Sequence, residues 1–497
     1  MVGAARPAHL KRIPMTTRPT GPYFDRTPLL APPLSPALPR PYIFDGSPRS
    51  LRAKVVSFIA KRYVDMMYVT GLPRVVADGR FRLRAIGQSG DLTTEPDITP
   101  RQAELEAAWR AGAITVVHDD ADRRIRVAWT DKSYGPPVEA TAVARPGYGG
   151  IVLGDRDQPA FDPVAISRPQ AAASPWKDGA ASGSAELGRA TDSFLAGSPG
   201  VYGVLVATSD RILVERYGEH GAPDRVTPSW SMTKAITATL IGRLIHEGWL
   251  GSVYDPAPAP LWSDPRGIHR LVTLDSLLRM RSGLGFQAID DHGQPAVYFE
   301  NNFVYYNAED AFDTAQRAIV ATLPGATYRY INTGVNVLGA IIRDQIEKRR
   351  LPYHATVYGL LADRIGMRSY EYSADHAGNF IASGSGAATL RDYARFGVLY
   401  LQDGVWGGER LLPEGWVAYA TTPSHTGSEY AACFRSNAGL MFPSLPRDAV
   451  WASGASDQRI ILLPKHGLVI VVTNETDHAI DLPALDRLGA AAIKAVA

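Results

Sequence analysis

Ser231 and Lys234 form an S-x-x-K sequence at the start of a run with helical periodicity, Ser231 to Leu250. Apolar residues recur along it at three- and four-residue spacing: Ile236, Leu240, Ile241, Leu244 and Ile245. Such a stripe faces a core, so we predict a packed helix that places the hydroxyl and the ammonium one turn apart on one face. If burial and neighbouring cations lower the pKa of Lys234, the lysine can take the serine proton, which makes a nucleophile without a histidine.

A second motif is Tyr330-Ile331-Asn332, which follows a Pro-Gly turn at Pro324. Asn332 and Gly334 favour a loop, and a helix is predicted from about Val335 to Ile346. A loop tyrosine can relay a proton, and the asparagine amide can bind a substrate carbonyl and accept from the lysine.

A third motif is the segment Trp451 to Gln458, which precedes two apolar runs separated by Lys465-His466-Gly467. The runs are predicted to form a β-hairpin. Gly454 would let a substrate's acyl group approach the backbone closely. Each motif alone also has an ordinary explanation, as a helix start, a packed turn tyrosine and a glycine turn between strands.

Together the three motifs resemble the serine β-lactamase and penicillin-binding-protein superfamily, in the order found in class C β-lactamases and related esterases and peptidases. Three connecting segments are similar to that family as well: Leu274–Leu284, Ala382–Gly397 and Phe396–Leu412. Within the superfamily, the Trp230–Lys234 run and Gln458 are similar to the aminohexanoate-dimer (nylon-oligomer) hydrolase branch. The resemblance covers about residues 190–495.

The resemblance implies a serine hydrolase that works through an acyl-enzyme without cofactor or metal. Ser231 would attack the carbonyl, Lys234 would accept its proton, and Tyr330 would protonate the leaving group. Asn332 would orient Lys234 and the substrate.

The same resemblance assigns the substrate-binding edge. Ser453 and Gly454 would line the substrate, and the backbone N–H groups of Ser231 and Ala455 would form the oxyanion hole. The family's usual Lys or His is Ala452 here, and Asp457 adds a negative charge nearby. We therefore expect neutral esters or amides to be favoured over carboxylate substrates such as cephalosporins, unless Arg459 turns into the site and replaces the lost cation.

The literal His425-Thr426-Gly427 tripeptide precedes this strand, and we interpret it as a loop. Three alternatives stay open: a β-lactamase, a D-Ala peptidase or penicillin-binding protein, and a catalytically silent ligand-binding module.

Composition restricts the function further. A net charge of +2 argues against a nucleic-acid binder, and a single cysteine, Cys433, excludes an internal disulfide framework and a multi-cysteine metal site. We expect Cys433 to be a small packed residue rather than a nucleophile. No apolar stretch of membrane-spanning length or signal-peptide pattern is visible, which favours the cytoplasm, with the periplasm as the alternative because many relatives are exported.

The expected fold class is α+β, β-lactamase/transpeptidase-like, with an antiparallel sheet flanked by helices, a helical lobe and a small N-terminal α/β extension. Hairpins are predicted at 113–129, at 201–217 and in the C-terminal part of the sheet, and a helix at 482–496 should pack on that sheet. Arg145 to Leu153 resembles the strand that ends the extension in the hydrolase branch. The expected divisions are an extended arm (1–49), an extension domain (50–155), a linker (156–189) and a hydrolase domain (190–497).

Overall fold

The computed structural model describes residues 43–45, 48–81, 102–168, 176, 183–264, 266–289, 295–298, 305, 309–424, 429–475 and 478–497. The predicted arm lies mostly outside these residues, and the His425-Thr426-Gly427 tripeptide lies wholly outside them. Among the described residues, none of the helices combines the length and apolar character needed to cross a bilayer.

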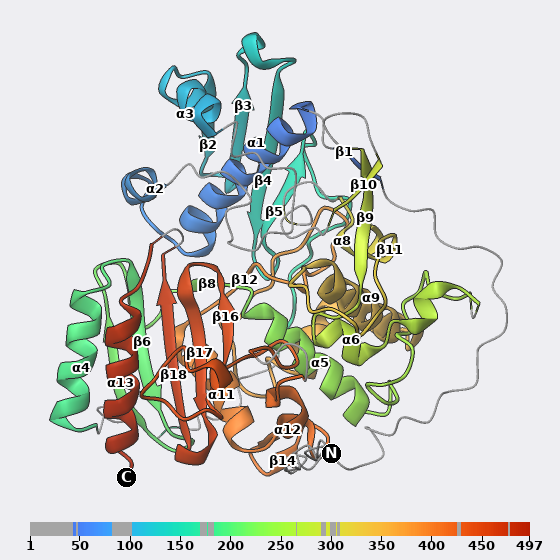
Figure 1. Ribbon diagram of the computed structural model, residues 1–497. Helices are drawn as coiled ribbons and strands as arrows, with labels where there is room; N and C mark the ends of the chain where they lie inside the picture. The colour runs from blue at the N-terminus through green and yellow to red at the C-terminus, as the bar shows by residue number, and fades with distance from the viewer. Residues whose placement is uncertain are drawn as a thin grey trace, which may run out of the picture.

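A six-stranded antiparallel sheet forms the centre of the C-terminal part (Figure 1). In sheet order its strands are β15 (Arg435–Ser436), β16 (Val450–Gly454), β17 (Gln458–Leu463), β18 (Leu468–Asn474), β6 (Val201–Ala207) and β7 (Ile212–Tyr217). Both hairpins predicted for this region are present, and β18 pairs with β6, so the two ends of the hydrolase segment meet in one sheet. The predicted antiparallel α+β architecture is confirmed.

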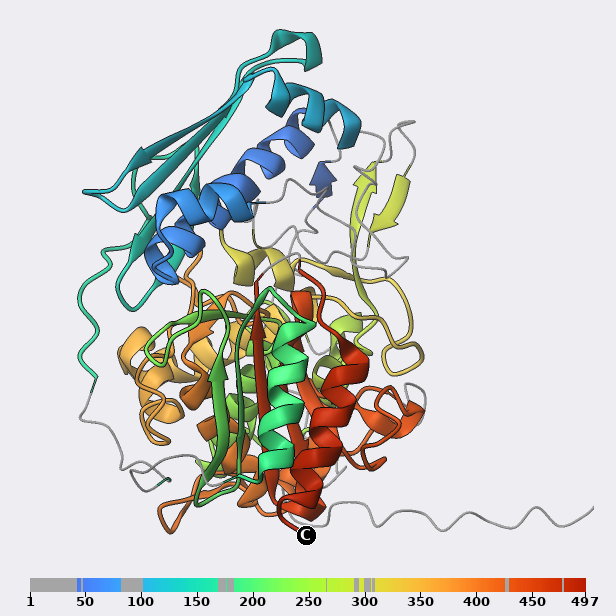
Figure 2. The same cartoon turned by 90° about the vertical axis from the view of Figure 1, so that its left-hand side faces the viewer.

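Helices cover both faces of this sheet. Helices α4 (Ala185–Ala196) and α13 (Leu482–Lys494) lie side by side on one face (Figure 2), and α11 (Leu390–Leu401) packs on the other. Adjacent residues of β18, such as Val469 and Ile470, enter the two different cores. A strand buried on both faces is apolar throughout rather than alternating, which is why this run is continuous in the sequence.

Helix α4 begins at Ala185, inside the range expected to be a linker. The Ser184 side chain accepts a hydrogen bond from the Leu187 N–H and so caps the helix, and Leu187 and Phe194 are fully buried in the sheet core. The apolar spacing of this short helix was missed because it follows a segment rich in Ala, Ser and Gly.

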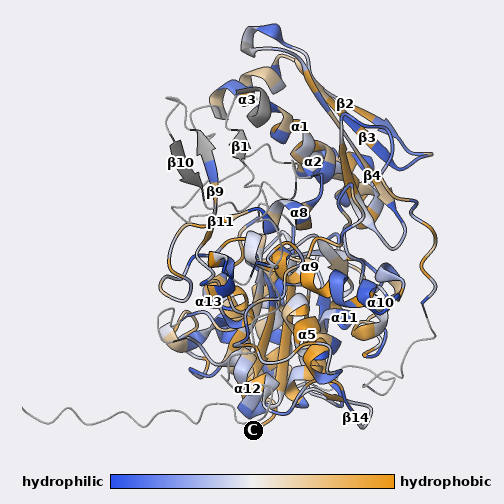
Figure 3. Cartoon of the chain, turned by 90° about the vertical axis from the view of Figure 1, so that its right-hand side faces the viewer, coloured by the Kyte–Doolittle hydropathy of each residue, from blue (hydrophilic) through white to orange (hydrophobic). Residues whose placement is uncertain are grey.

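The helical lobe is inserted between β7 and β15. Its helices are α5 (Thr233–His246), α6 (Leu274–Leu278), α8 (Ala311–Gln316), α9 (Thr333–Lys348), α10 (Tyr353–Leu360) and α12 (Trp416–Thr421). Its strands are β8 (Thr227–Trp230), β9 (Leu284–Ile289), β10 (Pro295–Tyr298), β11 (Ile319–Val320), β12 (Gly386–Ala388), β13 (Val405–Trp406) and β14 (Glu409–Arg410), and β9 also pairs with β1 (Ile43–Asp45). Helix α5 is buried almost all round, and many of its residues are apolar (Figure 3), so it is a core element of this lobe.

The helix bounds differ from the predicted ones at functionally important places. Helix α5 begins at Thr233, so Ser231 lies in the turn before it. Helix α9 begins at Thr333, so Gly334 belongs to its first turn and not to the predicted loop.

The N-terminal extension has a separate four-stranded antiparallel sheet. Its strands, in order, are β2 (Ile114–Asp119), β3 (Arg124–Trp129), β4 (Val138–Arg145) and β5 (Gly149–Gly154). Helix α1 (Pro48–Val64) packs on this sheet and continues into a short π-helix, Asp65–Val69, and α2 (Arg74–Arg80) and α3 (Gln102–Arg110) complete the unit. We propose the domain boundaries expected from the sequence, with one change. The linker ends before α4, because this helix begins at Ala185.

The segment from Arg145 to Leu153 is not the single strand that its resemblance implied. It forms the end of β4, a turn and most of β5. Gly147 and Gly149 in this turn have φ of 81° and 57°, a conformation that glycine adopts without steric cost. The chain therefore reverses here.

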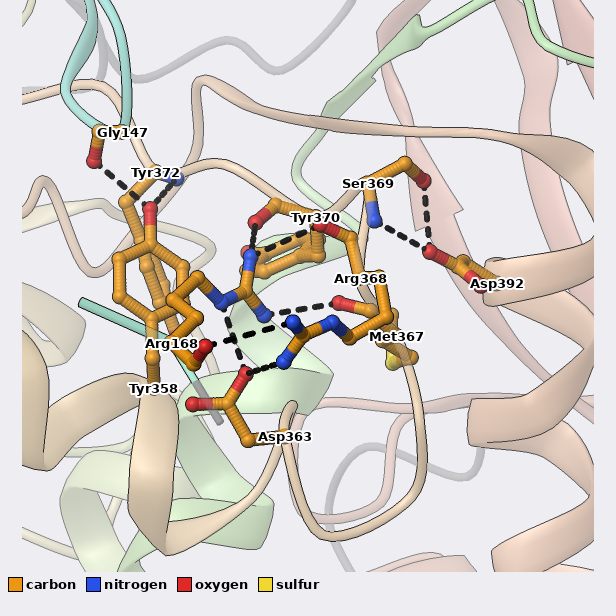
Figure 4. A network of polar contacts seen from close by, with 10 residues as sticks. All are labelled: Gly147, Arg168, Tyr358, Asp363, Met367, Arg368, Ser369, Tyr370, Tyr372 and Asp392. Carbon is orange, nitrogen blue, oxygen red and sulfur yellow. Dashed lines mark hydrogen bonds and ion pairs between the residues drawn. The ribbon is translucent and has the colours of Figure 1, made fainter. Parts of the chain in front are cut away.

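Arg168 fastens the segment after β5 to the hydrolase part (Figure 4). Its guanidinium donates to the Asp363 carboxylate at 2.7 Å and to the backbone carbonyls of Met367, Arg368 and Tyr370. It also lies 4.2 Å from the centre of the Tyr358 ring. One arginine thus orders the loop that leads towards β12.

Candidate active site

A tight turn between β8 and α5 presents Ser231. Trp230, just before it, has a φ of 44°, which is uncommon for a bulky residue and marks strain at a functional turn. The Ser229 hydroxyl donates to the Gly386 carbonyl and lies 2.7 Å from the Thr233 hydroxyl. Because Gly386 belongs to β12, the strand pair β8–β12 and these two side chains fix the turn on both sides of the serine.

Lys234 contacts the serine directly. Its ammonium nitrogen Nζ lies 2.8 Å from Ser231 Oγ and 2.5 Å from the backbone carbonyl oxygen of Ser383, and it donates to both. The residue is only 1% exposed. The structure therefore brings together the two residues of the S-x-x-K motif as predicted.

The charge state of Lys234 differs from the expectation. Burial by itself lowers the pKa of this lysine, but the phenol groups of Tyr305 and Tyr330 outweigh burial and raise the pKa above its ordinary value. The expected lowering of the pKa is therefore wrong, because groups that carry negative charge when ionised surround the ammonium. Lys234 rests as a cation that donates to the serine.

Tyr330 lies on the loop before α9, half-buried, with its ring centre 5.0 Å from Lys234 Nζ. The Arg329 N–H donates to the Met280 carbonyl at 2.8 Å and holds this loop against the helical lobe. Tyr430 packs edge-on against the Tyr330 ring, with 5.9 Å between ring centres. The Tyr330 ring is thus fixed beside the lysine.

Asn332 is buried just before α9, but the predicted hydrogen bond from Lys234 to its amide is not formed. The Ser383 carbonyl takes that place. The Asn332 amide oxygen accepts no hydrogen bond from the described residues. The Asn332 side chain does form a hydrogen bond with the phenol oxygen of Tyr305. Tyr305 also lies 3.1 Å from the Ser383 hydroxyl, so this tyrosine, which the motifs did not predict, joins the two.

Gly454 brings the edge of the central sheet to the serine turn. A Cβ atom added at Gly454 would lie 2.2 Å from the Ser229 carbonyl oxygen, so only glycine permits this approach of β16 to β8. Ala455 follows directly and is exposed. Neither its backbone N–H nor that of Ser231 donates to another residue in the part of the chain that the structure describes, as an oxyanion hole requires.

One site between the sheet and the helical lobe contains Ser231, Lys234, Tyr330 and the edge of β16 at Gly454. A family model described as Beta-lactamase matches residues 187–493. The chain belongs to the Beta-lactamase family. It is therefore a member of a family of serine hydrolases, and the predicted superfamily and fold are confirmed.

Individual relatives of this β-lactamase-family chain are distant. The 6-aminohexanoate-dimer hydrolase of Paenarthrobacter ureafaciens is 26% identical over 223 residues, which are 43% of this chain and 55% of that protein. The chain thus spans about half the length of this curated relative.

Two solved structures illustrate the range of similar folds. A penicillin-binding protein homologue from Caulobacter crescentus is 19% identical with a TM-score of 0.48, and the match covers 63% of this chain and 97% of that one. A class C β-lactamase from Rhodobacter sphaeroides is 16% identical with a TM-score of 0.44, and the match covers 63% and 99%.

The third motif of this β-lactamase-family chain has two distinct faces. Ala452 is fully buried in the core shared with the helical lobe, where it provides no charge. Ser453 pairs with Arg459 across β16 and β17, so both side chains lie on the opposite face. Arg459 donates to Asp457 at 2.5 Å and is 5% exposed. The prediction that it could turn into the site is therefore wrong, because its charge is already paired inside the protein.

Cys433 is buried, as expected of a packed residue. Burial raises the pKa of its thiol to about 12, although the nearby Lys234 ammonium opposes this shift. A thiol with such a pKa stays protonated at neutral pH and is a poor nucleophile.

Proposed function

We propose that this chain hydrolyses an ester or amide through an acyl-enzyme on Ser231, in the manner of a 6-aminohexanoate-dimer-hydrolase-like carboxylesterase or amidase. The observation that carries the proposal is the 2.8 Å contact between Lys234 Nζ and Ser231 Oγ, with the Tyr330 ring 5.0 Å from the same nitrogen. A nucleophile, a proton network and a substrate edge then share one site.

The raised pKa of Lys234 decides where the serine proton goes. A protonated lysine cannot accept another proton, so the reactive form is the one in which Lys234 and Tyr330 together hold one proton fewer. In that form Ser231 Oγ bonds to the substrate carbonyl carbon and its proton enters the pair. The pair returns a proton to the leaving oxygen or nitrogen as the scissile bond breaks.

Water then hydrolyses the acyl-enzyme by the reverse use of the same groups. It forms a bond to the acyl carbon, gives its proton to the pair, and Ser231 leaves with a proton from the pair. The Ser231 and Ala455 N–H groups bind the carbonyl oxygen as it becomes negative, and each such donor contributes about 10²–10³ in rate.

The curated relative from Paenarthrobacter ureafaciens acts, by its name, on the 6-aminohexanoate dimer, an amide. This likeness supports an amide or ester as the substrate of this chain. At 26% identity over about half of the relative's length, the likeness supports a substrate class and not one particular compound. β-Lactams and D-Ala peptides therefore belong in the test as competitors.

The test begins with a fluorophosphonate probe on the purified chain, followed by mass spectrometry of the labelled peptide. Labelling should occur on Ser231 and disappear in Ser231→Ala, while the exposed Ser444→Ala serves as the matched control and should label normally. Labelling that persists in Ser231→Ala would contradict the proposal.

A substrate panel then separates the alternatives. We expect turnover of p-nitrophenyl acetate or butyrate, or of a small amide. Faster turnover of nitrocefin would identify a β-lactamase, and stable labelling by penicillin would identify a penicillin-binding protein. A chain that neither reacts with the probe nor turns over any substrate would be a silent binding module.

A further inference from the structure

A cleft of about 220 Å³ lies where the N-terminal extension meets the hydrolase part. The extension contributes the end of the π-helix, the turn before β3 and the turn between β4 and β5. The hydrolase part contributes the segment before β8 and the loop before β12. None of the residues that we assign to the active site lines this cleft, so it is a separate site.

The extension supplies two arginines to the cleft, Arg123 and Arg145. Arg145 shares the Asp122 carboxylate with Arg124, and each guanidinium lies 2.8 Å from it. Arg123 is exposed, and its guanidinium forms no hydrogen bond or ion pair with any residue that the structure describes. One carboxylate is thus shared by two arginines, and the charge of Arg123 comes in addition.

The hydrolase part supplies a third arginine, Arg368. It shares the Asp363 carboxylate with Arg168, which lies 2.7 Å from it, whereas Arg368 lies 3.6 Å away (Figure 4). A separation of 3.6 Å is too long for a hydrogen bond. The Asp363 charge therefore serves mainly Arg168, and the Arg368 charge is only partly compensated.

Two carboxylates reduce the positive charge of the cleft. Glu371 lines it and accepts a hydrogen bond from the Gly147 N–H at 3.1 Å. Burial raises the pKa of Glu371, although the Gly147 N–H and the Arg123 charge oppose the shift. Asp120 is exposed and accepts from the hydroxyl of Tyr68, which also lines the cleft, at 2.6 Å. Since three guanidinium groups line the cleft against one carboxylate, positive charge is in excess.

We propose that this cleft binds a small anion that carries phosphate or carboxylate groups, through Arg123, Arg145 and Arg368. A guanidinium presents a planar fork of N–H donors that matches the oxygens of both groups, often with two parallel hydrogen bonds. The volume is below the about 300–1,000 Å³ of sites for drug-sized ligands, so the ligand is small. The inference does not depend on the proposed hydrolase activity.

The wall of the cleft is continuous with the strands that hold the nucleophile turn. Glu371 exchanges two backbone hydrogen bonds of 2.8 Å with Ala387 of β12, and β12 pairs with β8. Val226, on the same wall, directly precedes β8, which leads to Ser231. A bound anion would therefore fasten the extension to this strand pair. Because it would bind the folded chain alone, it should raise the melting temperature.

The test is calorimetric titration of inorganic pyrophosphate into the full chain at constant ionic strength. Arg123→Gln should raise the dissociation constant at least about tenfold, as loss of a charge-assisted hydrogen bond does. The matched control is Arg126→Gln, which removes an exposed arginine of β3 that pairs with Asp157 and does not line the cleft. The control should bind like the wild type. Equal weakening in both variants would overturn the proposal, because it would show a general effect of surface charge.

A second variant shifts the affinity in the opposite direction. Glu371→Gln keeps an acceptor for the Gly147 N–H but removes a negative charge from the cleft, so pyrophosphate should bind more tightly. A folding defect could only weaken binding, so weaker binding by Glu371→Gln would contradict the proposal.

Two further titrations define the ligand and separate the two proposals. Citrate serves as the carboxylate probe, and tighter binding of citrate or of pyrophosphate would support an anion site and show which group it prefers. No detectable binding of either anion to the wild type would overturn the site. Ser231→Ala should bind both anions like the wild type, so the result stands whether or not the chain hydrolyses any substrate.

Discussion

Lys234 donates a hydrogen bond from its ammonium group to the backbone carbonyl of Ser383, which lies 149 residues further along the chain. One turn along the same helix, the Thr237 hydroxyl donates to the Ala382 carbonyl at 2.6 Å. The Ser383 N–H in turn donates to the side chain of Asn336 on α9. The loop before β12 is therefore held between two helices and sets the direction of the lysine towards Ser231.

The first prediction concerns the proton network. Lys234→Met and Tyr330→Phe should each lower kcat/KM for an aryl ester at least about a hundredfold, as removal of a general acid–base group does. The double variant should be little worse than either single one, because the two groups hold and pass one proton. Losses that multiply would show that the residues act independently.

The second prediction concerns the pH dependence of activity. Since the pKa of Lys234 is raised, Lys234 holds its proton at neutral pH and loses it as the pH increases. We expect kcat/KM for a neutral ester to increase with pH, by nearly tenfold per unit between about pH 7 and 9. A rate profile measured in buffers of constant ionic strength would contradict this if it were flat or declined over that range.

The third prediction concerns the approach of β16 to the serine turn. Gly454→Ala would place a methyl group against the Ser229 carbonyl and push the sheet edge away from Ser231. Activity should fall at least about tenfold, because a small misplacement of reacting groups is costly. Gly188→Ala on α4, where an added Cβ meets nothing within 4 Å, is the control and should retain activity. Full activity of Gly454→Ala would mean that this edge takes no part in the reaction.

The fourth prediction concerns the attachment of the extension. Arg168→Ala leaves the buried Asp363 carboxylate without its main partner, which typically costs about 3 kcal/mol or more. Arg168→Lys should recover little, since an ammonium cannot reach four acceptors arranged for a guanidinium. Lys494→Ala, which breaks an exposed ion pair with Glu186, should change the stability by less than about 1 kcal/mol. Urea unfolding curves of the three variants would reveal equal shifts if the Arg168 contacts were unimportant.

The fifth prediction concerns stability and pH. Burial raises the pKa of Asp375 to about 7, although hydrogen bonds from Asn379 and Ala311 oppose the shift. The folded chain therefore binds a proton that the unfolded chain releases near its ordinary pKa of about 4, and this contribution to stability is lost as the pH increases through about 7. The melting temperature should decline between about pH 5 and 8.

Asp375→Asn, which cannot ionise, should weaken that decline even though it loses an acceptor. The exposed Asp192→Asn should leave the slope unchanged. An identical slope in Asp375→Asn and the wild type would assign the effect to other groups.

Local patterns in the sequence predicted much of this protein. Continuous apolar runs predicted β17 and β18, and three- and four-residue spacing predicted α5 and α9, because burial imposes these patterns on neighbouring residues. The spacing of Ser231 and Lys234 also predicted their contact, since one helical turn separates them.

Only the tertiary structure decided the partners of these residues. The acceptor for Lys234 is a backbone carbonyl, which every residue has, so no side-chain pattern could indicate Ser383. The raised pKa of Lys234 depends on Tyr305 and Tyr330, which only folding brings beside it. Likewise, Arg435 and Arg459 are alike in sequence, but strand pairing and packing set one beside Tyr330 and pair the other with Asp457. The pKa of Lys234 and the partners of these side chains depend on distances between segments that are remote in the chain. Those distances become short only when the sheet and the helical lobe pack together.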